Sequence, residues 1–183
     1  DCTLEYAIYG VFAFCPDCGS HNSLQILSKN IEMVEKEIAL ASNTEDKELA
    51  ERLVEDALEN AVAAFDGFGR AVCTAFSSKA TNPQQAQDIS FQNIQNARAR
   101  VCDLFGFDFA AGIDSDKWDT IVRCFQKRHL LAHKMGVIDQ EYKKKAKDPR
   151  AVLGRKIHIQ SGEVSELTEL LRTIGNNLAS ILK

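Results

Sequence analysis

The feature that most constrains the fold is a long stripe of apolar side chains between residues 49 and 76. Apolar residues recur there every three or four positions for roughly eight helical turns, a length of about 45 Å. The stripe consists of Leu49, Leu53, Ala57, Ala61, Phe65, Phe68, Val72 and Phe76. This pattern predicts one long amphipathic helix, weakened locally by Gly67 and Gly69. Such a helix has to bury its apolar face against other elements.

Shorter stretches with the same periodicity surround this segment. They predict helices over residues 24–41, 91–104, 116–136 and 164–182, and a short basic helix over 139–149. A polar, Pro-containing linker is expected at 77–87, and a brief strand or extended arm at 155–162. We therefore expect an all-α fold, a bundle of four or five helices over residues 23–183, preceded by a small separate segment over residues 1–22.

Length and composition are those of one globular domain. The chain has 183 residues, 45% of them hydrophobic, and no apolar run approaches the ~20 residues of a membrane span. It begins Asp-Cys-Thr without a signal peptide, and the missing initial Met suggests a piece of a longer protein. Cys73, Cys102 and Cys124 lie in apolar helical patterns and are expected to be small buried side chains. A reducing, cytoplasmic compartment is the expectation.

The charge is unevenly distributed along the chain. Residues 121–158 hold 11 Lys and Arg against three acidic residues, a charge of +8. The total is −4, so the rest of the chain carries −12. A basic segment on an acidic body can bind phosphate locally, and RNA is the partner that we expect. A solvated charged face is the alternative that charge alone leaves open.

The first 22 residues contain a cysteine pair in the sequence CPDCG. Two thiolates three residues apart on a tight turn, followed by Gly, are typical of a zinc knuckle. Strand-like sequence precedes the pair, so we expect a zinc-ribbon-like segment with a structural zinc and no open coordination position. The candidate ligands are Cys2, Cys15, Cys18 and His21. A cysteine just before residue 1 is the alternative to His21 for the fourth position, in which case residues 1–22 are a truncated ribbon. A redox-active or free cysteine pair remains the alternative.

The segment FQKRHLLAHKMGVIDQEY, residues 125–142, places an arginine and two histidines in an amphipathic helix. Its apolar stripe runs through Trp118, Ile121, Val122 and Phe125, and the same spacing continues to His129, Ala132 and His133. Imidazole can take up or release a proton near neutral pH. The guanidinium of Arg128 can hold two phosphate oxygens. In RNA the 2′-hydroxyl is a built-in nucleophile, so this set of groups suits phosphodiester cleavage without a metal.

Two other interpretations of these residues stay open. A His-x-x-x-His pair on one helix face is also the spacing of two zinc ligands, although no third ligand is evident nearby. Alternatively, His129 and His133 are core residues that find hydrogen-bond partners inside the protein.

The sequence RHLLAH, residues 128–133, resembles the Arg-x4-His motif of HEPN-domain ribonucleases, including the polar residue directly after Arg. The continuation HKMGVIDQEY is similar to the His-x-x-Gly-x-x-Asp-x-x-Tyr pattern common in that family. An all-α bundle with a long second helix and the motif late in the chain agrees with it. Most of residues 24–183 is covered by this resemblance, and only residues 128–142 carry its specific motif.

The resemblance implies a metal-independent endoribonuclease that acts as a homodimer, with two motif helices facing one composite cleft. His133 would be the general acid or base, and Arg128 would bind the scissile phosphate. His129 stands where the family often has Asn or Asp, which leaves its role open. Family members serve as toxins or antiviral effectors, so an antitoxin or a sensor domain is a further expected partner.

Two further hypotheses come from other functional classes. The first is a catalytically inactive HEPN-like module for dimerisation or nucleotide binding, in which the Arg and His are structural. The second is a zinc-ribbon nucleic-acid adaptor on a helical scaffold. The adaptor is disfavoured because residues 1–22 carry three acidic residues and no Lys or Arg.

Overall fold

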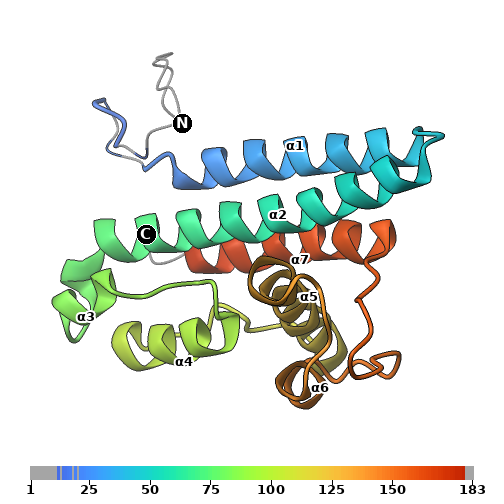
Figure 1. Cartoon of the computed structure of the whole chain (residues 1–183). Coiled ribbons are helices and arrows are strands. Elements are labelled where there is room, and N and C mark those ends of the chain that lie inside the picture. Colours follow the sequence, from blue (N-terminus) through green and yellow to red (C-terminus); the bar gives the residue numbers. More distant parts are fainter. Residues whose placement is uncertain (1–11, 13, 18, 20, 180–183) are drawn as a thin grey trace.

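The computed structural model describes residues 12, 14–17, 19 and 21–179, and the regular structure in this part of the chain is helical (Figure 1). The elements are α1 (Ser23–Ser42), α2 (Lys47–Ala75), the short 3-10 helix η1 (Ser77–Lys79), α3 (Pro83–Gln87), α4 (Ile94–Phe105), α5 (Ser115–Lys134), α6 (Gln140–Ala146) and α7 (Ser161–Ala179). In the described part of the chain, β-pairing is limited to the isolated bridges Phe14–His21 and Val137–Lys156. The predicted all-α fold is therefore confirmed for these residues.

The three helices α1, α2 and α7 pack side by side and form the main body (Figure 1). The predicted apolar stripe of α2 is buried between them from Ala57 to Val72, and Phe65 and Phe68 are completely inaccessible to solvent. At the start of the stripe Leu49 is 49% exposed, so the prediction of a fully buried face is wrong there. Each such side chain contributes about 1.5–3 kcal/mol by leaving water. Helix α7 approaches α1 closely at Gly175, where a Cβ atom would lie 2.6 Å from the Leu27 side chain.

Helix α5 packs against α2, α6 and α7 and crosses α2 and α7 steeply, so that Figure 1 shows it nearly end-on. The Asp114 side chain caps its first turn by accepting a hydrogen bond from the Lys117 N–H. The helix ends where Met135 and Gly136 adopt left-handed backbone conformations, with φ of 52° and 74°. No helix in the described ranges is both long and apolar enough to cross a membrane.

Two details of the connections differ from the predictions. The segment 77–87, expected to be a linker, contains η1 and α3, and Pro83 occupies the first turn of α3 after the Asn82 cap. Phe91 was expected to lie on a helix, but α4 begins at Ile94. The Phe91 ring is nevertheless fully buried, because the loop before α4 folds onto α2.

The extended arm expected at 155–162 is partly present. Val137 and Lys156 form a single bridge, and the Ile157 N–H donates to the Gly136 carbonyl over 2.8 Å. The arm therefore ties the end of α5 to the segment that leads into α7.

Candidate active site on helix α5

The structure places Arg128, His129 and His133 near the C-terminal end of α5. His129 and His133 are exposed, and Arg128 is half-buried. The core-histidine interpretation is therefore wrong for the single chain. The reason is which face of α5 packs against α7, because α7 contacts the face that carries Cys124 and Lys127. Because each residue turns the helix by about 100°, His129 lies almost opposite Lys127 and points away from the core.

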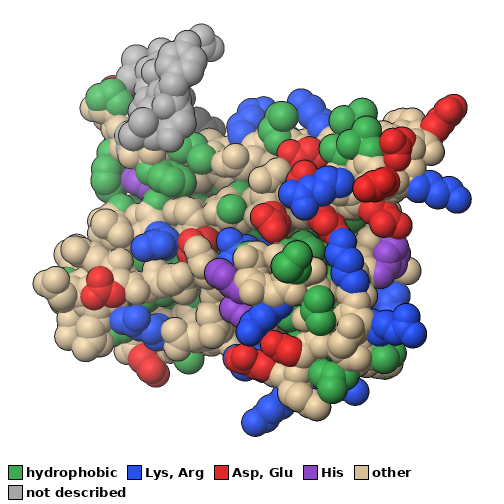
Figure 2. Space-filling model, viewed as in Figure 1, with side chains coloured by type: hydrophobic (Ala, Val, Ile, Leu, Met, Phe, Trp, Pro, Cys, Tyr) green, Lys and Arg blue, Asp and Glu red, His purple; other side chains and the backbone are tan. Residues whose placement is uncertain are grey.

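The two histidine rings lie against each other, with centroids 4.8 Å apart and planes inclined by 52°. This contact follows from the four-residue spacing of the two histidines, which places their side chains one helical turn apart on one face of α5. Figure 2 shows histidine side chains at the surface in the middle of this face of the molecule, with basic and acidic side chains beside them. The site thus has two imidazoles that substrate can reach from solvent.

Arg128 borders the same site and has a hydrogen-bond donor without an acceptor. Its Nε atom is buried and has no hydrogen-bond partner, and no ion pair in the described part of the chain involves this side chain. A buried guanidinium N–H without an acceptor is costly, since nearly all buried polar groups in proteins are paired. An anion at this position would satisfy it.

These residues line a pocket of about 390 Å³ that several elements enclose. Helix α6 contributes Glu141 and Lys145, whose side chains form an ion pair of 2.6 Å. The hydrogen bond from Lys145 holds the pKa of Glu141 below its ordinary value, so this carboxylate stays ionised. With Arg128 and Lys145 against Glu141, the pocket carries one formal positive charge before any histidine is protonated.

The remaining wall of the pocket is neutral and polar, and it consists of Ser90, Gln92, Asn93 and Gln126. The loop part of this wall is anchored on α2 by Asp66, a buried carboxylate. Asp66 Oδ1 accepts a hydrogen bond of 2.6 Å from the Phe91 N–H and a longer one of 3.4 Å from Ser90 Oγ. No pattern in the sequence indicates that this loop lines the same pocket as Arg128.

The residues after His133 build the support for α6. Asp139 caps α6 by accepting a hydrogen bond of 2.8 Å from the Tyr142 N–H. The Tyr142 ring is buried, and its hydroxyl donates to Asp148 Oδ2 over 2.8 Å. Burial, together with this hydrogen bond, raises the pKa of Tyr142 above its ordinary value. Gly136, Asp139 and Tyr142 therefore fix the turn and the helix that bring Glu141 and Lys145 to the pocket.

A buried ion pair on the opposite face of α5 was missed in the sequence. Lys127 is only 1% exposed, and its Nζ donates to Glu163 Oε2 over 2.7 Å and to the His158 carbonyl over 3.1 Å. Glu163 also accepts from Arg150 over 2.9 Å. The available signal was a lysine between Cys124 and Leu130, both of which are buried. A lysine on an apolar face predicts a partner but does not say where along the chain it lies.

The proposed metal ligands are only partly described. Cys2 and Cys18 lie outside the described residues, whereas Cys15 and His21 are both buried. A turn follows Cys15, in which the Gly19 N–H donates to the Cys15 carbonyl over 2.9 Å and Gly19 has a φ of 68°. No group of three His, Cys, Asp or Glu that would hold a metal occurs among the described residues.

The His21 ring lies among the aromatic rings of Phe12, Phe14 and Phe76, at centroid distances of 4.8–6.3 Å. Its Nδ1 atom is buried without a hydrogen-bond partner, and burial lowers the pKa of the ring. A neutral imidazole with an unpaired nitrogen fits the chemistry of a zinc ligand. The zinc site remains a prediction.

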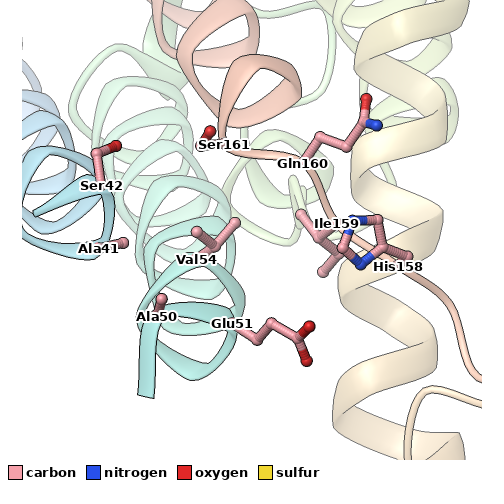
Figure 3. A pocket seen from close by; sticks show the side chains of 9 residues that line it. All are labelled: Ala41, Ser42, Ala50, Glu51, Val54, His158, Ile159, Gln160 and Ser161. Carbon is pink, nitrogen blue, oxygen red and sulfur yellow. The ribbon is translucent and has the colours of Figure 1, made fainter. Parts of the chain in front are cut away.

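A second hollow of about 420 Å³ lies between the end of α1, the start of α2 and the segment before α7 (Figure 3). Small and apolar side chains, among them Ala41, Ala50 and Val54, form much of its wall. Its ionisable groups are Glu51 and His158. With no arginine or lysine in its lining, this hollow lacks the groups that would hold a phosphate.

No family model, no curated protein and no solved structure matches the chain.

Proposed function

We propose that the chain is a metal-independent endoribonuclease of the HEPN type that acts as a homodimer. The observation that carries the proposal is the pair of exposed histidine rings, 4.8 Å apart, beside an arginine whose buried Nε has no partner. The helical architecture supports a HEPN-like bundle over residues 23–183, and the turn at Cys15 supports a zinc-ribbon-like segment before it.

The reaction follows from the groups in the pocket. Arg128 holds the non-bridging oxygens of one phosphate and stabilises the charge that develops on them. The 2′-hydroxyl attacks phosphorus and the bond from phosphorus to the 5′-oxygen breaks, which gives a 2′,3′-cyclic phosphate and a 5′-hydroxyl. One base removes the proton of the 2′-hydroxyl and one acid protonates the leaving 5′-oxygen. His133 performs one transfer, and His129 or the histidine of a second copy performs the other.

A second copy is part of the proposal because apolar side chains are exposed directly after α5, next to the site in sequence. Met135, directly after α5, is 85% exposed, and Val137 is 42% exposed. Apolar side chains at the edge of a polar site are suited to an interface, and a two-fold axis beside α5 would place two sets of Arg and His in one cleft. We propose that the protein acts in the cytoplasm as a toxin or antiviral effector and that an antitoxin or a sensor domain restrains it.

The deciding experiment is RNA cleavage in the presence of EDTA by the parent, Arg128→Ala, His133→Ala and the control His158→Ala. His158 is an exposed histidine outside the pocket on α5, so its substitution is expected to leave cleavage unchanged. Removal of a proton-transfer group typically costs about 10²- to 10⁴-fold in rate, and removal of a charge stabiliser about 10²- to 10³-fold. The products are expected to end in a 2′,3′-cyclic phosphate, and a 2′-deoxy nucleotide at the cut site is expected to block cleavage.

Each outcome of this experiment has a defined meaning. Cleavage by the parent that survives both Arg128→Ala and His133→Ala would refute the site assignment. Absence of cleavage by the parent, with nucleotides still bound, would favour the inactive nucleotide-binding module instead.

A further inference from the structure

One part of the pocket wall differs chemically from the rest of the site. Ser90, Gln92, Asn93 and Gln126 are neutral and polar, whereas the charges of the pocket come from Arg128, Glu141 and Lys145. Phosphate alone would be bound by the cationic part. The neutral polar wall therefore suits a second group of the ligand, one that lies next to the phosphate and has both hydrogen-bond donors and acceptors.

We propose that Gln126 and Gln92 bind one nucleobase of single-stranded RNA next to the phosphate held by Arg128, and so set the sequence preference of the site. This inference rests on the phosphodiester site proposed above. A carboxamide presents one acceptor and two donors in a plane, which is the pattern needed to pair with the edge of a base. Bases of single-stranded RNA expose these edges, whereas bases in a duplex do not.

Gln126 is the residue best placed for this role. It precedes His129 by three residues and His133 by seven, so the three side chains share one row along α5. Gln126 is half-buried, and no hydrogen bond in the described part of the chain involves its side chain. Its carboxamide is therefore free for a ligand. The Asn93 side chain, by comparison, already caps α4 by accepting from the Asn96 N–H.

Gln92 is held in place by the scaffold rather than by a loose loop. Asp66 is 7% exposed, and its two oxygens accept from the Phe91 N–H over 2.6 Å and from Gln92 Nε2 over 3.5 Å. The Phe91 ring packs so closely on α2 that a Cβ at Gly69 would lie 2.5 Å from it. These contacts anchor the backbone of the loop and leave the carbonyl oxygen of the exposed Gln92 side chain as an acceptor for a base.

The test is a binding titration of the parent with the four ribonucleoside 3′-monophosphates and with inorganic phosphate. We expect the parent to bind the four nucleotides with dissociation constants that differ by roughly 5- to 100-fold, the discrimination of one good amide-to-base pair. In Gln126→Ala we expect the four constants to converge while inorganic phosphate binds as before. Gln126→Glu keeps the shape but replaces the donor, so the preference is expected to move towards bases with an exposed amino group.

A matched control is Gln25→Ala, because Gln25 is an exposed glutamine on α1 outside this pocket. It is expected to leave all five constants unchanged. Equal binding of the four nucleotides by the parent, or an unchanged preference in Gln126→Ala, would overturn the inference even if the parent cleaves RNA. Discrimination that Gln126→Ala abolishes, in a parent that never cleaves RNA, would uphold the base-binding wall and refute the ribonuclease proposal. Failure of every nucleotide to bind would overturn the inference as well.

Discussion

The buried ion pair between Lys127 and Glu163 makes an asymmetric prediction about stability. Glu163→Gln leaves the Lys127 ammonium buried with only the His158 carbonyl and a neutral amide as partners. Breaking a buried pair in this way typically costs about 3–5 kcal/mol.

The reverse variant, Lys127→Met, is expected to cost less. The Glu163 carboxylate keeps its 2.9 Å contact with Arg150 and its 3.2 Å hydrogen bond from the Gln160 N–H, and the methionine fills the apolar space of the lysine stem. We expect a loss of about 2–3 kcal/mol in the free energy of unfolding, at or below the lower end of the range for broken buried pairs. The exposed pair Lys29–Glu32, with the same 2.7 Å separation, provides the control, and Lys29→Met is expected to leave the free energy of unfolding close to that of the parent.

Urea denaturation at pH 7 and at lower pH measures all of these differences. Burial alone would raise the pKa of Glu163, but the hydrogen bonds from Lys127 and the Gln160 N–H outweigh it and leave the pKa below its ordinary value. A lowered folded-state pKa means that the carboxylate stabilises the fold above the unfolded value of about 4.3 and loses this contribution as pH falls through the folded value. The gap between parent and Glu163→Gln is therefore expected to shrink in that range. A loss for Lys127→Met equal to or larger than that for Glu163→Gln would refute the reasoning.

The remaining predictions concern assembly, metal, guanidinium geometry and packing. Light scattering is expected to give twice the 20.3 kDa chain mass at micromolar concentration, and a monomer would contradict the composite site. Elemental analysis is expected to find close to one zinc per chain if residues 1–22 complete the site, and removal of the zinc by a chelator is expected to leave RNA cleavage intact. If chelation abolished cleavage and added zinc alone restored it, the metal would not be purely structural. Arg128→Lys is expected to cleave poorly, because an ammonium cannot hold two phosphate oxygens at once, and parent-like cleavage would argue against bidentate binding. Gly67→Ala is expected to raise the melting temperature, since nothing lies within 4 Å of its Cβ position, whereas Gly69→Ala is expected to lower it, because the Cβ would overlap Phe91. A change of the melting temperature in the same direction for both variants would contradict the packing argument.

Helix positions were predictable because they depend on local periodicity. The stripe from Leu49 to Phe76 corresponds to α2, Lys47–Ala75, and the pattern at 116–136 corresponds to α5, Ser115–Lys134. Phe91 shows where this information ends. Its spacing matched the helix that follows, but the Asn93 side chain starts α4 later by capping it, and the Phe91 N–H is bound by Asp66, a residue 25 positions away. A contact of this kind leaves no periodic trace in the sequence.

The members of the candidate site were predictable, but their surroundings were not. Chemistry and spacing identified Arg128, His129 and His133, and the structure brings all three to one pocket. The direction in which they point was not predictable, because the periodicity of the stripe from Trp118 through Phe125 does not show which side of α5 is covered by α7. Only long-range packing decides that, since Glu163 reaches α5 from 36 positions beyond Lys127.

The two faces of α5 explain how adjacent residues can serve different purposes. Lys127 points into the body and joins α5 to Glu163 at the start of α7, whereas Arg128 is its neighbour in sequence and borders the pocket. A helix turns by about 100° per residue, so the ion pair can fix the rotation of α5 without placing its own charge in the pocket. Because Lys127 and His129 lie about 200° apart, changes to the ion pair should affect the stability of the chain, and changes on the opposite face should affect what it binds. The separation follows because one face of α5 is buried against α7 and another face lines the pocket. It makes stability and site chemistry independently testable on the same helix.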